Sequence, residues 1–560
     1  MLAPNGRIAS LVGIAALVTA LLTACGGSET KTTTTTGTPI TAVEASRFLS
    51  QATFGPTPEE ISRLSAMGTD AWFSEQFRKP QKLHFAYMNA ALQSLASESD
   101  LREDQFFESF WQQAINGDDQ LRQRVAFALS QIFVISYQNT ALAYDARGVA
   151  HYYDTLGAYA FGNFRDLLQA VTLHPMMGNY LNALGNEKTN GAQVPNENYA
   201  REIMQLFTIG LRELNQDGTD TTTPYTPTYT NDDIKGMAKV FTGWSWGGPD
   251  KSDGRFNGWS PADPNRDWLP MQNYPQFHEV LKKEMPGLPA PGATTKGVTI
   301  AEYTSGEESL KIALDTLFYH PNVGPFIGYR LIQRLVTSNP SPAYVGRVAA
   351  AFANNGQGVR GDMKAVIYAV LMDPEARTVP ASTNNNAGKL REPVIRLANW
   401  MRAFHAHSSS GRFLIGNTDS TINELGQTPM RSPSVFNFYR PDYQPPNGDI
   451  FAAGIYAPEM QITEETSVVG YLNYMRNAIQ RGTGDAFDVK ADYTPELALA
   501  DTPELLLDRI NLLLMQNQMS PGLRAQILSA IKSNPNNSKP NKVYLAVFLT
   551  MASPEYIVQK

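Results

Sequence analysis

The segment 195–211 (PNENYAREIMQLFTIGL) places ionisable side chains on a helical pattern that is otherwise apolar. Its polar face carries Asn198, Arg201, Glu202 and Gln205, and Glu197 lies one helical turn before Arg201. Apolar residues cover most of the other sides, which is typical of a buried helix. We therefore expect these charges to be at least partly desolvated, and desolvated charges must be paired.

Two interpretations of this segment remain open. In the first, Glu197 and Arg201 form a structural ion pair, worth only about 0.2 to 0.5 kcal/mol on a solvated face. In the second, the charges line a polar pocket, because buried ionisable groups cluster at functional sites. One glutamate, Glu197 or Glu202, would then act as general acid or base, and Arg201 would orient it or bind an anionic group.

A glycosidase site would need a second carboxylate from another part of the chain. Glu197 and Glu202 are five residues apart, which is roughly 140° of rotation on a helix, so they cannot flank one bond together. The candidates for the second carboxylate are Asp166, Glu392 and Glu459.

We expect the walls of such a cleft to come from Tyr199 and from the loop that contains Trp244 and Trp246, with Asn196 and His174 as further binding candidates. Two tryptophans in a glycine-rich turn suit either stacking on the apolar face of a sugar or packing on the core. The same turn matches the G-x-S-x-G pattern, but a nucleophile elbow requires a strand before it and a helix after it. Here a helical pattern precedes the turn and a loop follows, which argues against a nucleophilic serine.

Metal and cofactor signals are weak. The seven histidines form no HExxH motif, and His405 and His407 would converge only on a strand. Glu213, Asn215, Asp217 and Gly218 match the first half of a calcium loop, but Pro224 occupies the place of the bidentate glutamate. No phosphate-binding glycine loop is present, and the net charge is -7. We therefore predict no metal, no cofactor, no nucleotide and no nucleic-acid partner.

The N-terminus predicts an exported lipoprotein. An apolar stretch follows Arg7 and is too short to span a bilayer, which is typical of a signal peptide over residues 1–24. It ends in LTAC, which resembles the bacterial lipobox, in which the cysteine is diacylated and becomes the mature N-terminus; Cys25 is the only cysteine of the chain. Acyl chains on Cys25 would anchor the protein to a membrane. Gly26 stands where an inner-membrane retention signal has aspartate, which favours the outer membrane, on its periplasmic or cell-surface face.

The remaining chain predicts one large, mainly α-helical domain over residues 42–560, after a Thr-rich tether at 25–41. At 42% hydrophobic and 18% charged residues, the 560-residue composition is that of a globular protein. Helical periodicity and capping signals predict helices at 58–67, 101–115, 120–136, 198–211, 232–241, 307–318, 323–336, 342–353, 363–371, 393–404 and 503–515. The stretch 244–299 is rich in Gly, Pro and aromatic residues and predicts an irregular insertion with a small hairpin.

Several ordered motifs, among them SRFLSQATFGPTPEEI, PNENYAREIMQLFTIGLRELNQDGT, RGDMKAVIYAVLMDPEAR, REPVIR and SPSVFNFYRPDY, resemble those of the bacterial family called domain of unknown function 1800. The resemblance covers roughly residues 42–559. It implies export and a co-exported, sulfatase-like partner of the family called domain of unknown function 1501. It assigns no catalytic residue.

Two functional hypotheses follow. The first is a helical scaffold that works with an exported partner, its loops 244–291 and 432–446 forming the contact. The second is a hydrolase or binding protein for an envelope or environmental glycan, acting through the cleft around Glu197, Arg201 and Glu202. The sequence favours the scaffold, because the catalytic geometry cannot be assembled from spacing alone, and whether the chain is an enzyme stays open.

Overall fold

The computed structural model describes residues 37–560 except 260–262, 264, 382–383, 385 and 534–536. Within them the chain forms 25 α-helices and four two-stranded sheets, which confirms the mainly helical fold. None of the helices in this described part is long and apolar enough to cross a membrane.

The first half of the chain contains α1 (Ala42–Ala52), α2 (Pro58–Met67), α3 (Thr69–Gln76), α4 (His84–Leu92), α5 (Glu103–Asn116), α6 (Gln120–Ser130), α7 (Ala146–Tyr159), α8 (Phe164–Leu173), α9 (Pro175–Tyr180), α10 (Asn198–Gln205), α11 (Asn231–Val240) and α12 (Asp253–Phe256). The second half contains α13 (Gly306–Tyr319), α14 (Val323–Leu335), α15 (Pro342–Ala353), α16 (Met363–Met372), α17 (Pro374–Arg377), α18 (Pro393–Ala403), α19 (Gly448–Ala452), α20 (Glu465–Arg481), α21 (Thr494–Ala498), α22 (Pro503–Met515), α23 (Pro521–Lys532), α24 (Lys539–Ala552) and α25 (Pro554–Ile557).

The strands pair antiparallel and two by two. The pairs are β1 (Trp244–Ser245) with β2 (Gln272–Asn273), β3 (Lys283–Pro289) with β4 (Lys296–Ile300), β5 (Lys389–Leu390) with β8 (Val558–Gln559), and β6 (His407–Ser408) with β7 (Val489–Lys490). Short 3₁₀ helices occur at η1 (Glu98–Asp100), η2 (Pro275–Phe277), η3 (Pro458–Ile462) and η4 (Asp485–Phe487).

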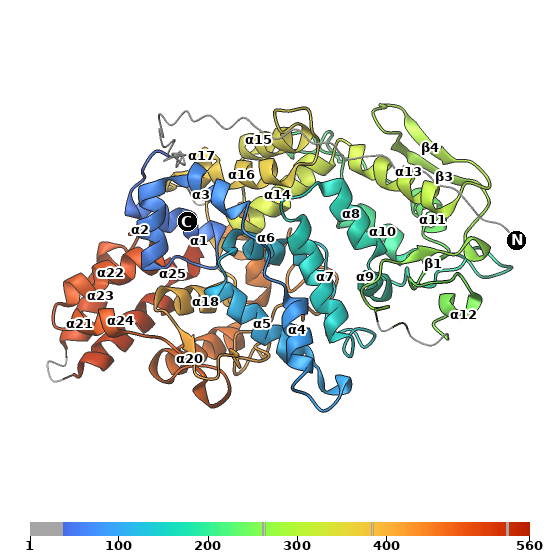
Figure 1. Cartoon of the computed structure of the whole chain (residues 1–560). Helices are drawn as coiled ribbons and strands as arrows, with labels where there is room; N and C mark the ends of the chain where they lie inside the picture. The colour runs from blue at the N-terminus through green and yellow to red at the C-terminus, as the bar shows by residue number, and fades with distance from the viewer. Residues whose placement is uncertain (1–36, 260–262, 264, 382–383, 385, 534–536) are drawn as a thin grey trace, which may run out of the picture.

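Figure 1 shows an elongated helical body. The hairpin β3–β4 lies at one end with α11 and α13, and α21–α24 lie at the other end. Helices α6 and α14 pass through the middle, where they contact each other.

Capping residues set several helix boundaries as predicted. The Thr57 hydroxyl accepts from the amide of Glu60, Pro58 occupies the first turn, and Gly68 ends α2 with φ 76°. Helices α15 and α22 have the predicted bounds.

Two helices end earlier than predicted, because the residues after them form hydrogen bonds that do not continue the helix. Helix α10 stops at Gln205, since the amides of Ile209 and Gly210 both donate to the carbonyl of Met204 and Gly210 has φ 69°. Helix α6 stops at Ser130, and the chain beyond it runs to the loop near residue 430, where the amide of Tyr137 donates to the carbonyl of Met430.

The insertion 244–299 contains the predicted hairpin. Strands β3 and β4 pair from Lys283 opposite Ile300 to Pro289 opposite Lys296, with one register shift. Helix α11 packs on β3 so closely that a Cβ on Gly236 would lie 1.9 Å from the carbonyl oxygen of Glu284. A glycine inside this helix is therefore required by packing.

The C-terminus is held inside the fold. Strand β8 pairs with β5, and the side-chain amide of Gln559 donates to the carbonyls of Leu335 and Val336 at 3.2 Å each. The Arg47 guanidinium of α1 donates to the carbonyl of Lys560. Figure 1 accordingly places the C-terminus beside α1.

Candidate functional site

Helix α10 contributes mainly to the core. Tyr199 is 2% exposed, donates its hydroxyl to Thr172 Oγ1 at 2.8 Å and packs edge-on against Phe241 at 4.9 Å between ring centroids. Its ring is therefore directed into the core, and its predicted role as the wall of a cleft stays a prediction. The direction of the Tyr199 side chain depends on Thr172 of α8, and the sequence around Tyr199 does not indicate this contact.

Glu197 and Arg201 form an ion pair at the surface. Glu197 Oε2 lies 3.4 Å from Arg201 Nη2, and their side chains are 39% and 42% exposed. Asn196, which is exposed, accepts the amide of Asn198 at its Oδ1 and so caps the start of α10. This geometry agrees with the first interpretation, in which Glu197 and Arg201 form a structural ion pair.

Glu202 is the desolvated charge on this helix. It is 8% exposed, and its Oε2 has no hydrogen-bond partner among the described residues. Burial raises the pKa of Glu202, and Arg201 opposes that effect. The charge of Glu202 in turn raises the pKa of the nearby Tyr180 and Tyr229, after the larger effect of their own burial.

The tryptophan turn packs on the body. Trp244 is 6% exposed in β1, and Trp246 is partly buried under the guanidinium of Arg266, 4.8 Å from the ring centroid. Ser245 is fully buried and donates to the carbonyl of Phe256 at 2.6 Å, so it is not a nucleophile. Trp244 and Tyr199 bury their rings in the protein, so the aromatic walls predicted for this cleft are directed mainly into the core.

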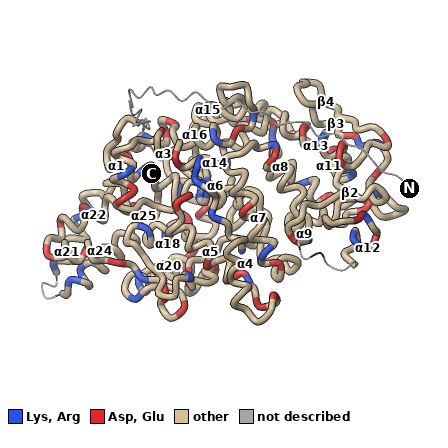
Figure 2. The backbone as a smooth tube through the Cα atoms, viewed as in Figure 1, with Lys and Arg blue, Asp and Glu red and all other residues tan. Residues whose placement is uncertain are grey.

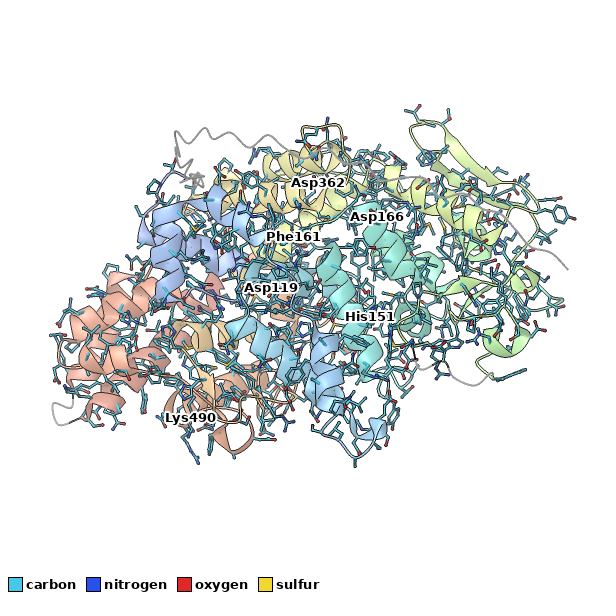
Figure 3. The ribbon with its side chains drawn as sticks, in the orientation of Figure 1. Asp119, His151, Phe161, Asp166, Asp362 and Lys490 are labelled. Atoms are coloured by element: carbon cyan, nitrogen blue, oxygen red, sulfur yellow. The ribbon has the colours of Figure 1, made fainter. Side chains whose placement is uncertain are left out.

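His174 forms a pair with His151, which Figure 3 labels on α7. His174 Nδ1 accepts the amide of Met176 at 3.2 Å, so its Nε2 carries the proton and donates to His151 Nδ1 at 3.0 Å. Burial lowers the pKa of both rings. Asp154, three residues after His151, instead accepts the amides of His84 and Phe85 at the start of α4.

The three candidate second carboxylates lie in two different places. Asp166 is exposed in the first turn of α8 (Figure 3). Glu392 and Glu459 are both buried around Lys389, whose Nζ lies 3.8 Å from Glu392 Oε1 and 3.1 Å from Glu459 Oε1. Neither of them reaches the Glu197–Arg201 pair as a catalytic partner, since both are held in this separate buried cluster.

The described residues contain no group of three or more His, Cys, Asp or Glu arranged to hold a metal ion. His405 and His407 line a cavity of about 340 Å³ and are exposed, with His405 Nε2 3.5 Å from Glu59. In the calcium-like turn, Asp217 Oδ1 accepts the amide of Thr219, and Glu213 pairs with Lys296 at 2.5 Å. That turn is closed by its own hydrogen bonds.

A second cavity, of about 400 Å³, is the most promising binding site, and we call it the arginine cavity. Helix α14 contributes Phe326, Tyr329, Arg330 and Arg334 to its lining. The rest of the lining comes from residues between 205 and 225, from residues 435–436 and 441–442, and from Gln131, Ile132 and Tyr456. The loop 432–446, which the sequence predicts as a partner contact, therefore forms one wall of this cavity.

The arginine cavity combines aromatic rings with hydrogen-bonding groups. The aromatic residues of its lining are Tyr225, Phe326, Tyr329, Phe436 and Tyr456, and the uncharged polar groups include the amides of Gln131 and Gln205. Asp220 and Asp442 add carboxylates, and Asp220 lies 3.3 Å from Arg212. This mixture can stack on apolar faces and orient hydroxyl groups.

A buried charge cluster lies behind the cavity. Glu392 accepts the side-chain amides of Gln131 and Gln427, the latter at 2.9 Å. Burial by itself would raise the pKa of Glu392, but Lys389, Arg334 and Arg124 hold it below its ordinary value. Figure 2 shows basic segments of α6 and α14 side by side in the middle of the molecule, where this cluster lies.

Sequence reasoning missed Arg330 and Arg334. The signal was present, because two arginines four residues apart on an apolar helical pattern, with no acid within four positions of either, must face the same side. The other lining residues come from distant parts of the chain and carry no common local pattern.

The described residues form a helical protein whose arginine cavity is lined by aromatic rings, arginines and aspartates. The chain belongs to the DUF1800 family of proteins of unknown function, whose family model matches residues 47–558. Comparisons with the curated proteins and with the solved structures found no match. Cys25 and the predicted signal peptide lie outside the described residues.

Proposed function

We propose that this protein is an exported binding protein that holds part of a glycan in the arginine cavity. The observation that carries this proposal is the lining itself, in which five aromatic rings and several amide and carboxylate groups surround about 400 Å³. Aromatic rings stack on the C–H faces of sugars, and planar polar groups pair with hydroxyls.

We favour binding over hydrolysis because most carboxylates in and behind the cavity are paired with cations. Asp220 is engaged by Arg212, and Glu392 and Glu459 are buried around Lys389. A glycosidase needs one protonated and one ionised carboxyl group free to flank the scissile bond. These three acids are already paired with cations, and Asp442, the other carboxylate of the lining, cannot by itself supply the two free carboxyl groups.

The test is calorimetric titration of the full-length protein, in detergent, with neutral and acidic oligosaccharides, followed by analysis of the sugars for cleavage. We expect binding without cleavage, and we expect Tyr329→Ala and Phe436→Ala to weaken it. Tyr144→Ala is the matched control, because Tyr144 is 76% exposed and does not line the cavity. Absence of binding would contradict the proposal, and appearance of shorter sugars would assign a hydrolase instead.

A second proposal concerns a protein partner. The insertion and the residues just after it expose Trp259 and Tyr303, each at 80%, and Leu281 at 53%. Exposed aromatic residues are enriched where proteins bind each other. We propose that an exported partner, of the sulfatase-like kind that the family resemblance implies, docks there. A tagged chain should then co-purify with an exported protein, Trp259→Ala should reduce the recovery, and Tyr144→Ala should not. Equal recovery with both variants would contradict this docking site.

We also propose that the protein is anchored in the outer membrane through acyl chains on Cys25. The lipobox-like sequence supports this, as does the start of the family match at residue 47, after the signal peptide and tether.

A further inference from the structure

We propose that the arginine cavity selects an acidic glycan, with one carboxylate or sulfate group of a sugar held between Arg330 and Arg334. This inference rests on the proposed function and names the class of ligand.

Arg330 and Arg334 lie one turn apart on α14, and both line the cavity. The Arg334 guanidinium lies 4.6 Å from the ring centroid of Tyr439, and Arg334 is 4% exposed. Arg330 lies 5.0 Å from the ring centroid of Phe326 and donates to Gln333 Oε1 at 3.0 Å. Aromatic rings and a glutamine side chain therefore orient the two arginines.

Neither arginine forms a direct ion pair within the described chain, although Glu392 lies near Arg334 and Asp442 lies near Arg330. Among the described residues, no carboxylate oxygen lies within 4.0 Å of a guanidinium nitrogen of Arg330 or Arg334. Like charges at this spacing on a helix repel each other, and charge removed from water without a partner is costly. An anion between the two guanidinium groups would offset both effects, and a guanidinium can hold a carboxylate or sulfate through two parallel hydrogen bonds.

The buried acids behind the cavity do not supply that anion. Glu392 and Glu459 are engaged by Lys389 and, for Glu392, by two glutamine amides. Arg124 adds a further positive charge, since its Nη2 donates to the carbonyl of Arg334 at 2.7 Å. With the charged residues of the lining included, five cations (Arg124, Arg212, Arg330, Arg334 and Lys389) face four anions (Asp220, Asp442, Glu392 and Glu459).

A sugar fits the lining better than a peptide does. The lining residues come from helices and loops, and none belongs to strands β1–β8, so a peptide would find no strand edge to extend. The aromatic rings and the carboxylates of Asp220 and Asp442 instead suit sugar faces and hydroxyls. The same two carboxylates disfavour a ligand that is charged at every position.

The experiment is calorimetric titration of the full-length protein with three oligosaccharides of equal length, one neutral, one containing uronic acid and one sulfated. We expect the acidic sugars to bind more tightly than the neutral one, and the comparison between uronate and sulfate identifies the source of the anion. Arg330→Gln and Arg334→Gln should each weaken acidic binding roughly tenfold or more, and should weaken neutral binding by a clearly smaller factor. Arg212→Gln is the control within the same cavity, and it should have a smaller effect because Arg212 already pairs with Asp220.

Salt dependence of the unaltered protein gives a readout that needs no variant. Affinity for the acidic sugars should fall as ionic strength rises, and affinity for the neutral sugar should not. Equal binding of neutral and acidic sugars, insensitive to salt, would overturn the inference while the proposed function stands. Failure of every sugar to bind would overturn both. Binding of an acidic peptide in place of the sugars, dependent on Arg330 and Arg334, would overturn the choice of glycan.

Discussion

At the scale of single residues, Glu197 and Glu202 show how differently two acids of one helix can be placed. Glu197 shares a solvated ion pair with Arg201, whereas Glu202 is buried near Tyr180 and Tyr229 with an unpaired oxygen. An unpaired buried carboxylate costs stability whenever it is ionised.

We therefore predict that Glu202→Gln stabilises the protein at neutral and higher pH. The folded-state pKa of Glu202 is raised by burial, so its favourable contribution is complete below the unfolded-state pKa and is lost as the pH rises through the folded-state pKa. The difference in melting temperature between Glu202→Gln and the unaltered protein should be small at pH 4 and grow toward pH 8.

Glu197→Gln is the matched control for that comparison. It removes a single exposed pair and should cost no more than about 0.5 kcal/mol at any pH. If Glu202→Gln lowered the melting temperature at pH 8, Glu202 would have a stabilising partner that its surroundings here do not contain.

The sequence predicts which residues form the polar face of α10, but not which of them is buried. Periodicity identifies Arg201, Glu202 and Gln205 as neighbours on one face. The two tyrosines whose pKa Glu202 raises, Tyr180 and Tyr229, come from other segments of the chain. The same limit applies to Tyr199 and Trp244, whose core partners are remote in sequence.

At the scale of elements, the sequence predicts helix boundaries well where the capping residues are next to the helix in sequence. Helices α2, α15 and α22 each begin with a proline in the first turn, after Thr57, Ser341 and Thr502, and Gly68 ends α2. Helix α6 ends early, and beyond it the amide of Tyr137 donates to the carbonyl of Met430. Helix α10 ends early because Gly210 adopts a left-handed conformation and closes the turn. The packing of α11 on β3 likewise depends on a contact that is distant in sequence.

That contact gives a prediction at this scale, with Gly236→Ala expected to destabilise the protein. Alanine usually stabilises a helix relative to glycine, but here its Cβ would meet the carbonyl oxygen of Glu284 at 1.9 Å. We expect a loss of roughly 1 to 3 kcal/mol, measured by chemical or thermal unfolding.

Gly346→Ala in α15 is the control, because the nearest atom to its new Cβ would be Asp217 Cα at 3.7 Å, an ordinary contact. This variant should gain up to about 1 kcal/mol. A gain in both variants would mean that α11 does not approach β3 as closely as described.

At the scale of the whole molecule, composition and helix periodicity are sufficient to predict a mainly helical protein with an irregular insertion. The arginine cavity is beyond such reasoning, since its walls come from α14, the turn after α10 and the loop 432–446. Only the folded chain brings these segments together.

The proposed lipid anchor predicts where the whole molecule resides in the cell. The unaltered protein should incorporate labelled palmitate and fractionate with the outer membrane, and Cys25→Ser should lose the label and appear in the soluble fraction. Gly26→Asp is the control, because it should keep the label and move to the inner membrane. Retention of Cys25→Ser in the membrane fraction at the original level would contradict the anchor.

The last four residues of the chain complete hydrogen bonds that begin far upstream. The edge of β5, the guanidinium of Arg47 and the carbonyls of Leu335 and Val336 all bind residues 557–560. These contacts can therefore form only after the C-terminal segment has been synthesised.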